Sequence, residues 1–270
     1  MRRLGARQAL LLLAASCGCY RAVNYPDPAA PVYTGQHARR TPLPRTELRV
    51  VTFNIAYAQQ IDRALEVLRE ESALALPDVL CLQEMDAAGV DRIARALGLN
   101  YVYFPSALHP KFERDFGCAI LSPWPLSETR KIVLPPGARI TGLQRVLTVA
   151  TLRRGDGRYR VYAVHLPSPM GIPSDARRRQ IETLLDDASA SPDPVVVAGD
   201  FNSETVGEQF LQAGFEWPTR DAGLSTAFLG FGFSYDHVFS RGLRRIAAGV
   251  IENNGAASDH YPVWAVLARP

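Results

Sequence analysis

Apolar, β-rich runs alternate along the chain with segments whose apolar residues recur at helical spacing. Residues 49–55 and 79–82 are two such runs, and Ile61, Leu65 and Leu68 recur between them at helical spacing. This pattern predicts a strand, a helix and a second strand that runs parallel to the first. A chain built from such units must bury its strands in a sheet that helices cover.

A second pattern, further along the chain, is typical of a hairpin. Residues 146–152 and 159–165 are β-rich and flank Arg154-Gly155-Asp156-Gly157, a strong turn signal. Because a hairpin pairs its strands antiparallel, the sequence predicts an α/β protein with mixed sheets. Other expected strands are residues 101–104, 118–121, 195–198, 238–239 and 263–267, and two further helices are expected at residues 90–97 and from Ser174.

The composition allows one full-sized folded domain. The chain has 270 residues, is 47% hydrophobic and carries a formal net charge of +3. Arg2, Arg3 and Arg7 lie in an N-terminal segment that we expect to be removed, which leaves the mature chain near neutrality. Its overall charge therefore does not attract a polyanion, and nucleic acid would have to bind through a local patch.

The first residues have the layout of an export signal. A basic start precedes the apolar residues 9–15, which are too few for the roughly 20 residues of a membrane-spanning helix. Ala14-Ala15-Ser16-Cys17 resembles a bacterial lipobox, so we expect a signal peptide over residues 1–16 and lipidation of Cys17. Ordinary cleavage and acylation of Cys19 remain alternatives.

This pattern predicts where the protein is found. An exported lipoprotein of the bacterial cell envelope would be held on a membrane by its N-terminal lipid anchor. Gly18 rather than Asp after the cysteine is similar to lipoproteins of the outer membrane, so we expect a periplasmic or surface-facing domain. That domain is expected to be a monomer.

A proline-rich segment separates the signal from the expected domain. Residues 17–47 contain five prolines and have no apolar periodicity. We expect a semi-rigid tether there, with the folded domain at residues 48–270. The alternative is an N-terminal arm that packs on the surface of the domain.

Two cysteines remain in the expected domain. Cys81 and Cys118 each lie in an apolar, strand-like run, so they are either buried thiols or, in an exported protein, a disulfide. The chain has no Cys-x-x-Cys spacing that would indicate zinc.

Polar residues follow the expected strands, at the point where each strand ends. Asn54, Glu84 and His165 end three of the β-rich runs. The later runs lead to Asp200, Asn202, Asp236, Asp259 and His260. Oxygen ligands without thiolates suit a hard cation such as Mg²⁺ or Mn²⁺. Each residue alone is typical of a turn or cap, so the evidence is in the series.

This series, in this order, resembles the endonuclease/exonuclease/phosphatase family, which has the deoxyribonuclease I-like fold. The resemblance extends from about residue 49 to residue 267, and its most specific motifs are Gly199-Asp200-Phe201-Asn202 and Ser258-Asp259-His260. It implies a four-layer α/β fold, in which two mixed β-sheets pack as a sandwich between outer helices. Other matching positions are Thr52-Phe53-Asn54, Leu82-Gln83-Glu84, Gly117 to Ser122, Arg145, His165-Leu166, Arg179-Gln180, Tyr235-Asp236-His237 and Tyr261-Pro262.

The resemblance also implies a divalent-metal site. Glu84 would be the principal carboxylate ligand of Mg²⁺ or Mn²⁺, with Asn54 and Asp259 as further oxygen ligands, bound directly or through water. Such a metal neutralises a phosphate oxygen and stabilises the leaving alkoxide.

The catalytic roles follow from the same resemblance. Asp200 and Asn202 would hold and activate the attacking water, and Asp236 would orient the imidazole of His260. His165 would contact the phosphoryl group from the other side. Which of the three groups Asp200, His165 and His260 moves the proton is left open.

Substrate choice is expected to depend on four loops at the rim of the site. These are residues 105–115, 135–143, 167–175 and 223–233. Phe231 and its aromatic neighbours could stack on bases, enter a lipid surface or pack in the interior. Arg177-Arg178-Arg179 could meet phosphates or be the solvated start of a helix, and His109 and His237 are interpreted as structural or rim residues.

Three functions are consistent with the sequence. The first is an exported, metal-dependent phosphodiesterase that is nuclease-like. The second is a phospholipid phosphoesterase, similar to a sphingomyelinase, or an inositol phosphate phosphoesterase. The third is an inactive member that only binds. The family's common Ser-Arg-x-Pro is Ser122-Pro123-Trp124-Pro125 here, and this departure affects substrate preference because it removes no catalytic position.

Overall fold

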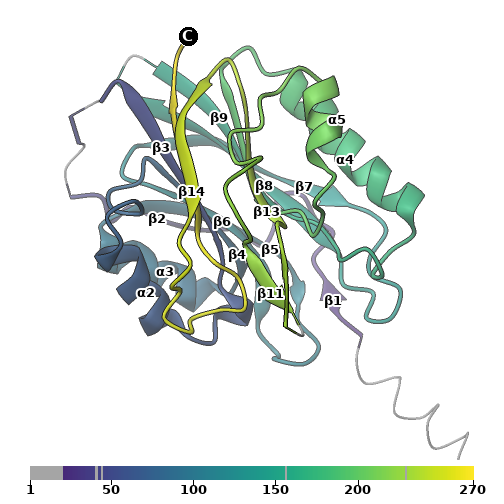
Figure 1. Cartoon of the computed structure of the whole chain (residues 1–270). Helices are drawn as coiled ribbons and strands as arrows, with labels where there is room; N and C mark the ends of the chain where they lie inside the picture. Colours follow the sequence, from purple (N-terminus) through teal and green to yellow (C-terminus); the bar gives the residue numbers. More distant parts are fainter. Residues whose placement is uncertain (1–20, 40–41, 44, 156, 229) are drawn as a thin grey trace, which may run out of the picture.

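The computed structural model contains two β-sheets that pack face to face (Figure 1). It describes residues 21–39, 42–43, 45–155, 157–228 and 230–270. The expected signal peptide and Cys17 lie outside the described residues. The first sheet has the strand order β1-β5-β6-β4-β3-β15-β14, with β2 also paired to β5. Its strands are β1 (Val23–Asn24), β2 (Tyr33–Gly35), β3 (Glu47–Asn54), β4 (Val79–Met85), β5 (Asn100–Leu108), β6 (Asp115–Ser122), β14 (Arg244–Val250) and β15 (Val263–Ala268).

The second sheet has the order β13-β10-β9-β8-β7. Only β9 and β10 pair in parallel in it, and the expected hairpin is formed by β8 and β9. Its strands are β7 (Leu126–Leu134), β8 (Arg145–Arg154), β9 (Gly157–His165), β10 (Val195–Asp200) and β13 (Asp236–Arg241). A separate short hairpin joins β11 (Thr226–Phe228) to β12 (Phe231–Phe233).

Helices cover the outer face of each sheet. On the first sheet, α2 (Ile61–Glu70) and α3 (Ala87–Leu97) contribute Leu65, Leu68 and Ile93 to one core. On the second, α4 (Ser174–Ser189) and α5 (Gly207–Gln212) pack on the opposite side, and a third core lies between the sheets. The expected four-layer architecture is therefore confirmed. A short 3-10 helix, η2 (Ala56–Ala58), follows β3.

The proline-rich segment does not form a tether over its described part. β1 and β2 both pair with β5, so residues 23–35 extend the first sheet by two short edge strands. The buried Lys131 donates through Nζ to the carbonyls of Tyr25 (3.0 Å) and Ala30 (2.6 Å). The prediction of a tether is wrong here, because extended, proline-rich backbone can pair at a sheet edge. The alternative, an arm packed on the domain, describes residues 21–39.

Cys81 and Cys118 are buried and do not form a disulfide. They lie on the paired strands β4 and β6, where burial raises the pKa of both thiols and keeps them protonated. Over the described part of the chain, no helix has the length and apolar character needed to cross a membrane.

A buried ion pair lies at the end of the sandwich where β4 begins and β8 ends. The Asp78 carboxylate accepts from the backbone N–H of Arg49 (2.8 Å) and from Nε1 of Trp124 (2.7 Å). It also pairs with Nε of Arg154 at 3.0 Å, and both side chains are under 10% exposed. Because Asp78 immediately precedes β4 of the first sheet and Arg154 ends β8 of the second, this pair connects the two sheets.

Replacing Arg154 with Met should destabilise the protein strongly, because the Asp78 charge would be left buried without its partner. The expected loss is about 3–5 kcal/mol in the free energy of unfolding, measured by urea denaturation. Arg153→Met, which alters the exposed neighbour, is the control and should change stability by less than about 0.5 kcal/mol. Equal urea midpoints for the two variants would contradict the assigned role of the ion pair.

Candidate active site

Strand register brings three of the expected site residues into one row. In the second sheet, Asp200 at the end of β10 lies opposite His165 of β9 on one side and Asp236 of β13 on the other. The row needs a glycine beside it. A Cβ on Gly199, whose φ is +157°, would lie 1.9 Å from the carbonyl oxygen of Val164. Only glycine therefore lets β10 approach β9 closely enough to place Asp200.

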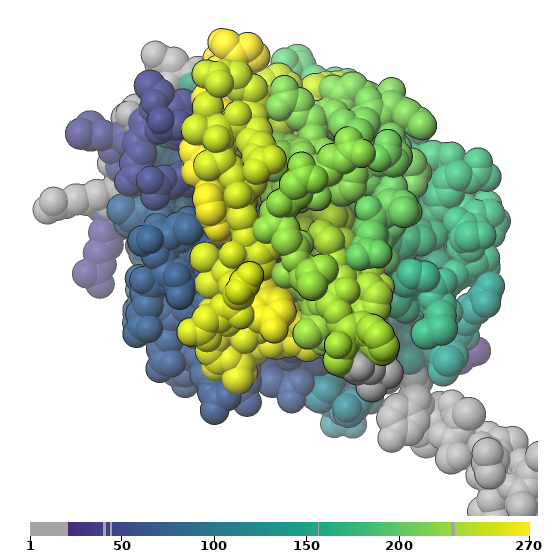
Figure 2. All heavy atoms as spheres, viewed as in Figure 1, coloured from purple at the N-terminus to yellow at the C-terminus, as the bar shows by residue number. Residues whose placement is uncertain are grey.

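His260 reaches this row from the segment between β14 and β15. That C-terminal segment (yellow) lies beside the green segment that includes β11 (Figure 2), and a Thr226–His260 bridge joins them. Nδ1 of His260 lies 2.8 Å from Oδ2 of Asp236 and 3.0 Å from Oγ1 of Thr226. Ser225 donates through Oγ to the same carboxylate oxygen at 2.8 Å. The expected Asp236–His260 pair is therefore present and is held in one orientation.

The carboxylate of Asp200 lies at the centre of the cluster. Its Oδ2 accepts from Nδ2 of Asn54 (3.1 Å) and Nδ2 of Asn202 (3.0 Å). His165 approaches the same oxygen through Nε2 at 3.3 Å, and Nε2 of His260 is 3.8 Å from it. Asp200 thus contacts residues from both sheets.

Glu84 occupies the side of the cluster that belongs to the first sheet. It lies in a β-bulge of β4 with φ of +58°, a conformation uncommon for residues other than glycine. Its carboxylate accepts from the backbone N–H of Tyr57 (3.1 Å) and from Nδ2 of Asn54 (3.4 Å). The exposed Asp259 faces the same region, where its charge helps to raise the pKa of Glu84.

The pKa values of His165 and His260 are shifted in opposite directions. Burial lowers the pKa of His260, but the carboxylates of Asp236 and Asp200 outweigh it and raise that pKa to about 10. Burial lowers the pKa of His165 well below its usual value, and the charge of Arg145 adds to the effect. Burial raises the pKa of Asp200 to about 7, although His260 opposes it. Near neutrality the cluster therefore holds one imidazolium and one neutral imidazole beside the same carboxylate.

Two groups of side chains could hold a metal ion. Asp200, Asp236 and His260 offer ligand atoms that all lie within 4.8 Å of one another. In that group, Nδ1 of His260 is already hydrogen-bonded to Asp236, and a charged imidazole has no lone pair for a metal. The second group is Glu84 with Asn54 and Asp259. Its two carboxylates offer oxygen atoms, which suit a hard cation.

Asn54 faces the carboxylates with its amide nitrogen. Nδ2 donates to Glu84 and to Asp200, while Oδ1 accepts from the backbone N–H of Ala56 at 3.1 Å. In this arrangement Asn54 orients two carboxylates, and direct coordination through its oxygen requires the amide to turn over. That Asn54 is an oxygen ligand therefore stays a prediction, and it requires this change.

Arg145 is one of the positions that resemble the family, and the sequence alone indicates no role for it. Its guanidinium lies over the ring of Phe116, 4.9 Å from the ring centroid, and its terminal nitrogen Nη1 is buried with no hydrogen-bond partner within the described structure. The charges of Glu84 and Asp200 act on it. Arg145 is therefore a cation of the site, and the signal for it was a charged residue at the start of an otherwise apolar strand.

Arg177 is a structural residue. Its guanidinium donates to the carbonyls of Pro167, Phe201 and Asn202, so it fixes the loops that follow β9 and β10. Arg178 and Arg179 are exposed and pair with acidic residues on their own helix.

His109 and His237, interpreted from the sequence as rim or structural residues, have those places in the structure. Nε2 of His237 is 2.9 Å from the carbonyl oxygen of Ser203, and Trp217 donates to Nδ1, so His237 is structural. His109 packs on Tyr57 and Phe112 at the rim, where burial lowers its pKa to about 4. In the aromatic loop, Phe231 is 69% exposed, which excludes interior packing for that ring.

Comparison with protein families supports the resemblance. The model of a family described as the Endonuclease/Exonuclease/phosphatase family matches residues 51–260. No curated protein sequence matches the chain.

Solved structures show the same fold. An endonuclease/exonuclease/phosphatase from Beutenbergia cavernae is 24% identical, with a TM-score of 0.66 over 83% of this chain and 72% of that one. A Bacteroides vulgatus endonuclease/exonuclease/phosphatase is 16% identical, with a TM-score of 0.68 over 84% and 100%. TDP2 from D. rerio, complexed with a single-strand DNA product, is 18% identical, with a TM-score of 0.67 over 83% and 99%.

Asp236→Asn should lower the pKa of His260, because Asp236 supplies the largest favourable charge that acts on the imidazolium. We expect a fall of more than about one unit, followed by NMR titration of the imidazole signals. The imidazole signals of His37, which pairs with Asp91 beside α3, serve as the internal control for the substitution. An unchanged His260 titration would show that the two residues are not coupled.

Proposed function

Because the chain belongs to the endonuclease/exonuclease/phosphatase family, we propose that it is an exported, divalent-metal-dependent hydrolase of phosphodiester bonds. The observation that carries the proposal is the buried Asp236–His260 pair beside Asp200, in a cluster where Nε2 of His165 is 3.8 Å from Glu84. A charged imidazole, a carboxylate that shares protons near neutrality and a second carboxylate with oxygen neighbours are the groups that such a hydrolysis needs.

The residues of the second sheet would act on the water and the phosphate. Asp200, held by Asn202 and Asn54, would orient the attacking water and accept its proton. His260, kept charged by Asp236, would donate to a phosphate oxygen, where negative charge accumulates. His165, which is neutral, would donate its Nε2 hydrogen to the phosphoryl group or to Asp200.

The residues of the first sheet would hold the metal. Glu84 fits Mg²⁺ or Mn²⁺ because its buried carboxylate has a raised pKa that a bound cation would bring down again. Asp259 and, after its amide turns, Asn54 would complete the oxygen set. The bound cation would supply charge neutralisation for the phosphate and for the leaving oxygen.

Two substrate classes are proposed as alternatives. A phosphodiester of nucleic acid is supported by TDP2, a neighbour in fold that is complexed with single-strand DNA. A phospholipid or an inositol phosphate is the alternative, and the near-neutral mature chain favours it over a polyanion. A binding module without activity is the weakest proposal, because every expected site residue is present and most of them lie in one cluster around Asp200.

Export is part of the proposal. The basic start, the apolar run and Cys17 support an N-terminal lipid anchor on the bacterial cell envelope. We propose a periplasmic or surface-facing domain that acts as a monomer.

Asp200→Ala and His260→Ala should each lower turnover of a phosphodiester by about 10²- to 10⁴-fold, because both remove a positioned proton-transfer or charged group. Hydrolysis of bis(p-nitrophenyl) phosphate in Mg²⁺ measures this. His37→Ala, away from the site, is the control and should keep full turnover. Near-normal turnover in both site variants would refute the proposed site.

Activity should disappear in excess chelator and return with Mg²⁺ or Mn²⁺. Glu84→Gln should raise the Mg²⁺ concentration needed for half of maximal activity by about tenfold or more, since it removes one ligand charge. Glu113→Gln, on the exposed rim, is the matched control. Full hydrolysis in the chelator would disprove metal dependence, and an unchanged Mg²⁺ titration would remove Glu84 from the ligand set.

A further inference from the structure

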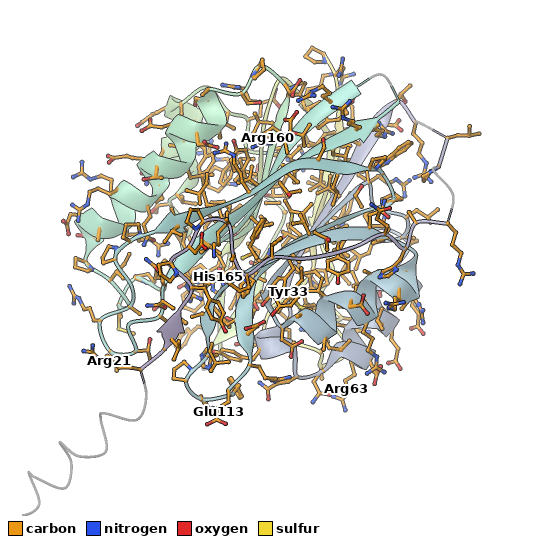
Figure 3. All side chains as sticks on the ribbon, turned by 180° about the vertical axis from the view of Figure 1, so that it is seen from behind. Arg21, Tyr33, Arg63, Glu113, Arg160 and His165 are labelled. Atoms are coloured by element: carbon orange, nitrogen blue, oxygen red, sulfur yellow. The ribbon has the colours of Figure 1, made fainter. Side chains whose placement is uncertain are left out.

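The docked N-terminal arm begins at the same edge of the molecule as the catalytic cluster. In Figure 3, Arg160 lies in the first half of β9 and His165 ends the strand, and Arg21 lies toward the end that carries His165. Ala22 donates its backbone N–H to the carbonyl of Thr141 at 2.8 Å, and Nδ2 of Asn24 donates to Gly142 at 2.8 Å. The chain therefore enters the fold beside the rim loop of residues 135–143.

This entry point shares a small apolar cluster with the site. Ala22 packs against Ala107, Phe116 and Leu143. The ring of Phe116 is also 5.8 Å from the ring of His165, and it carries the Arg145 guanidinium. A single layer of side chains thus separates the start of the arm from two residues of the catalytic edge.

The arm is held by polar contacts as well as by pairing. Lys131, 3% exposed, binds two arm carbonyls, and the hydroxyl of Tyr25 donates to Asp115 at 2.9 Å. Oδ1 of Asn24 accepts from the backbone N–H of Gln144 at 3.0 Å. These contacts fix the start of the described chain beside the rim loop of residues 135–143.

Two exposed apolar side chains lie on the rim next to the arm. Ile140 is 87% exposed and Met170 is 88% exposed, and a hydrogen bond from the Arg139 N–H to Gly171 (2.8 Å) joins their loops. Arg21 and Arg139 are exposed cations at the same place, and neither forms an ion pair with any other described residue. Apolar tips flanked by cations suit an anionic lipid surface.

Cys17 lies four residues before Arg21, and four residues of chain span at most about 14 Å. We propose that the arm holds the catalytic edge against the lipid surface and that the substrate is the phosphodiester of a phospholipid headgroup. This inference rests on the proposed hydrolase and on acylation of Cys17. A 30-residue tether would leave the edge free to meet dissolved substrates, whereas the docked arm keeps it at the membrane.

The orientation is tested on the full-length, acylated protein in vesicles of phosphatidylethanolamine and phosphatidylglycerol that contain a brominated phospholipid quencher. A fluorophore is attached to Met170→Cys at the catalytic rim or to Leu76→Cys, an exposed apolar residue at the opposite end, where β4 begins. Both variants carry Cys19→Ser, and the buried Cys81 and Cys118 do not react. We expect quenching at position 170 to exceed that at position 76 by about twofold or more. Equal quenching, or a protein that does not bind vesicles, would overturn the proposal.

The substrate is tested with variants that release the arm without altering the site. Lys131→Met and, as a second variant, Asn24→Ala should slow hydrolysis of vesicle phosphatidylglycerol by about tenfold, since both reduce the effective concentration of the edge at the membrane. Arg130→Met, an exposed neighbour on β7, is the control. All three variants should hydrolyse dissolved bis(p-nitrophenyl) phosphate at the unaltered rate.

The outcomes separate this inference from the proposed function. No hydrolysis of the dissolved ester by the unaltered protein would mean that the hydrolase proposal fails. Hydrolysis of the dissolved ester, with single-strand DNA cleaved faster than vesicle lipid and no effect of Lys131→Met, would leave the hydrolase intact. That result would overturn the lipid substrate in favour of nucleic acid.

Discussion

The buried carboxylate of Asp200 is the constraint on which the rest of the site depends. Its side chain is 1% exposed, and an unpaired charge buried to that degree costs several kcal/mol. The compensating donors come from both sheets, because Asn54 ends β3 in the first and His165 ends β9 in the second. The two sheets must therefore bring these strand ends together for Asp200 to be stable. The polar cluster and the packing of the sandwich stabilise each other at this edge.

The same burial explains why two histidines of one cluster differ in charge. His260 has the carboxylate of Asp236 on its Nδ1 side and that of Asp200 near Nε2, and these charges outweigh its desolvation. Desolvation is the largest influence on His165, and Arg145 is its cationic neighbour. Groups whose pKa values are pushed apart in this way can take opposite roles in proton transfer. The difference arises from the placement of Asp236 and Arg145, not from the histidines themselves.

The strands and the site residues could be predicted from the sequence for the same reason. A buried strand needs an apolar run, and the polar residue that ends it, such as Glu84, interrupts that run visibly. Strand β7 has no such visible apolar run. Exposed charges such as Arg130 fill its solvent side, and a bulge breaks its alternation at Glu128. The role of Arg145 was also hidden. Its importance comes from Phe116 and Glu84, which lie far away in the sequence.

The arm shows most clearly what a local pattern cannot reveal. Proline restricts the backbone of the unfolded chain, so a proline-rich segment loses little entropy when it packs, and a few contacts are enough to hold it. Here Lys131, more than 100 residues away, supplies two of those contacts, and nothing near Tyr25 or Ala30 in the sequence indicates it. Composition alone describes a spacer and a docked arm equally well. Yet the two differ in function, because a docked arm makes the orientation of the catalytic edge a property of the fold.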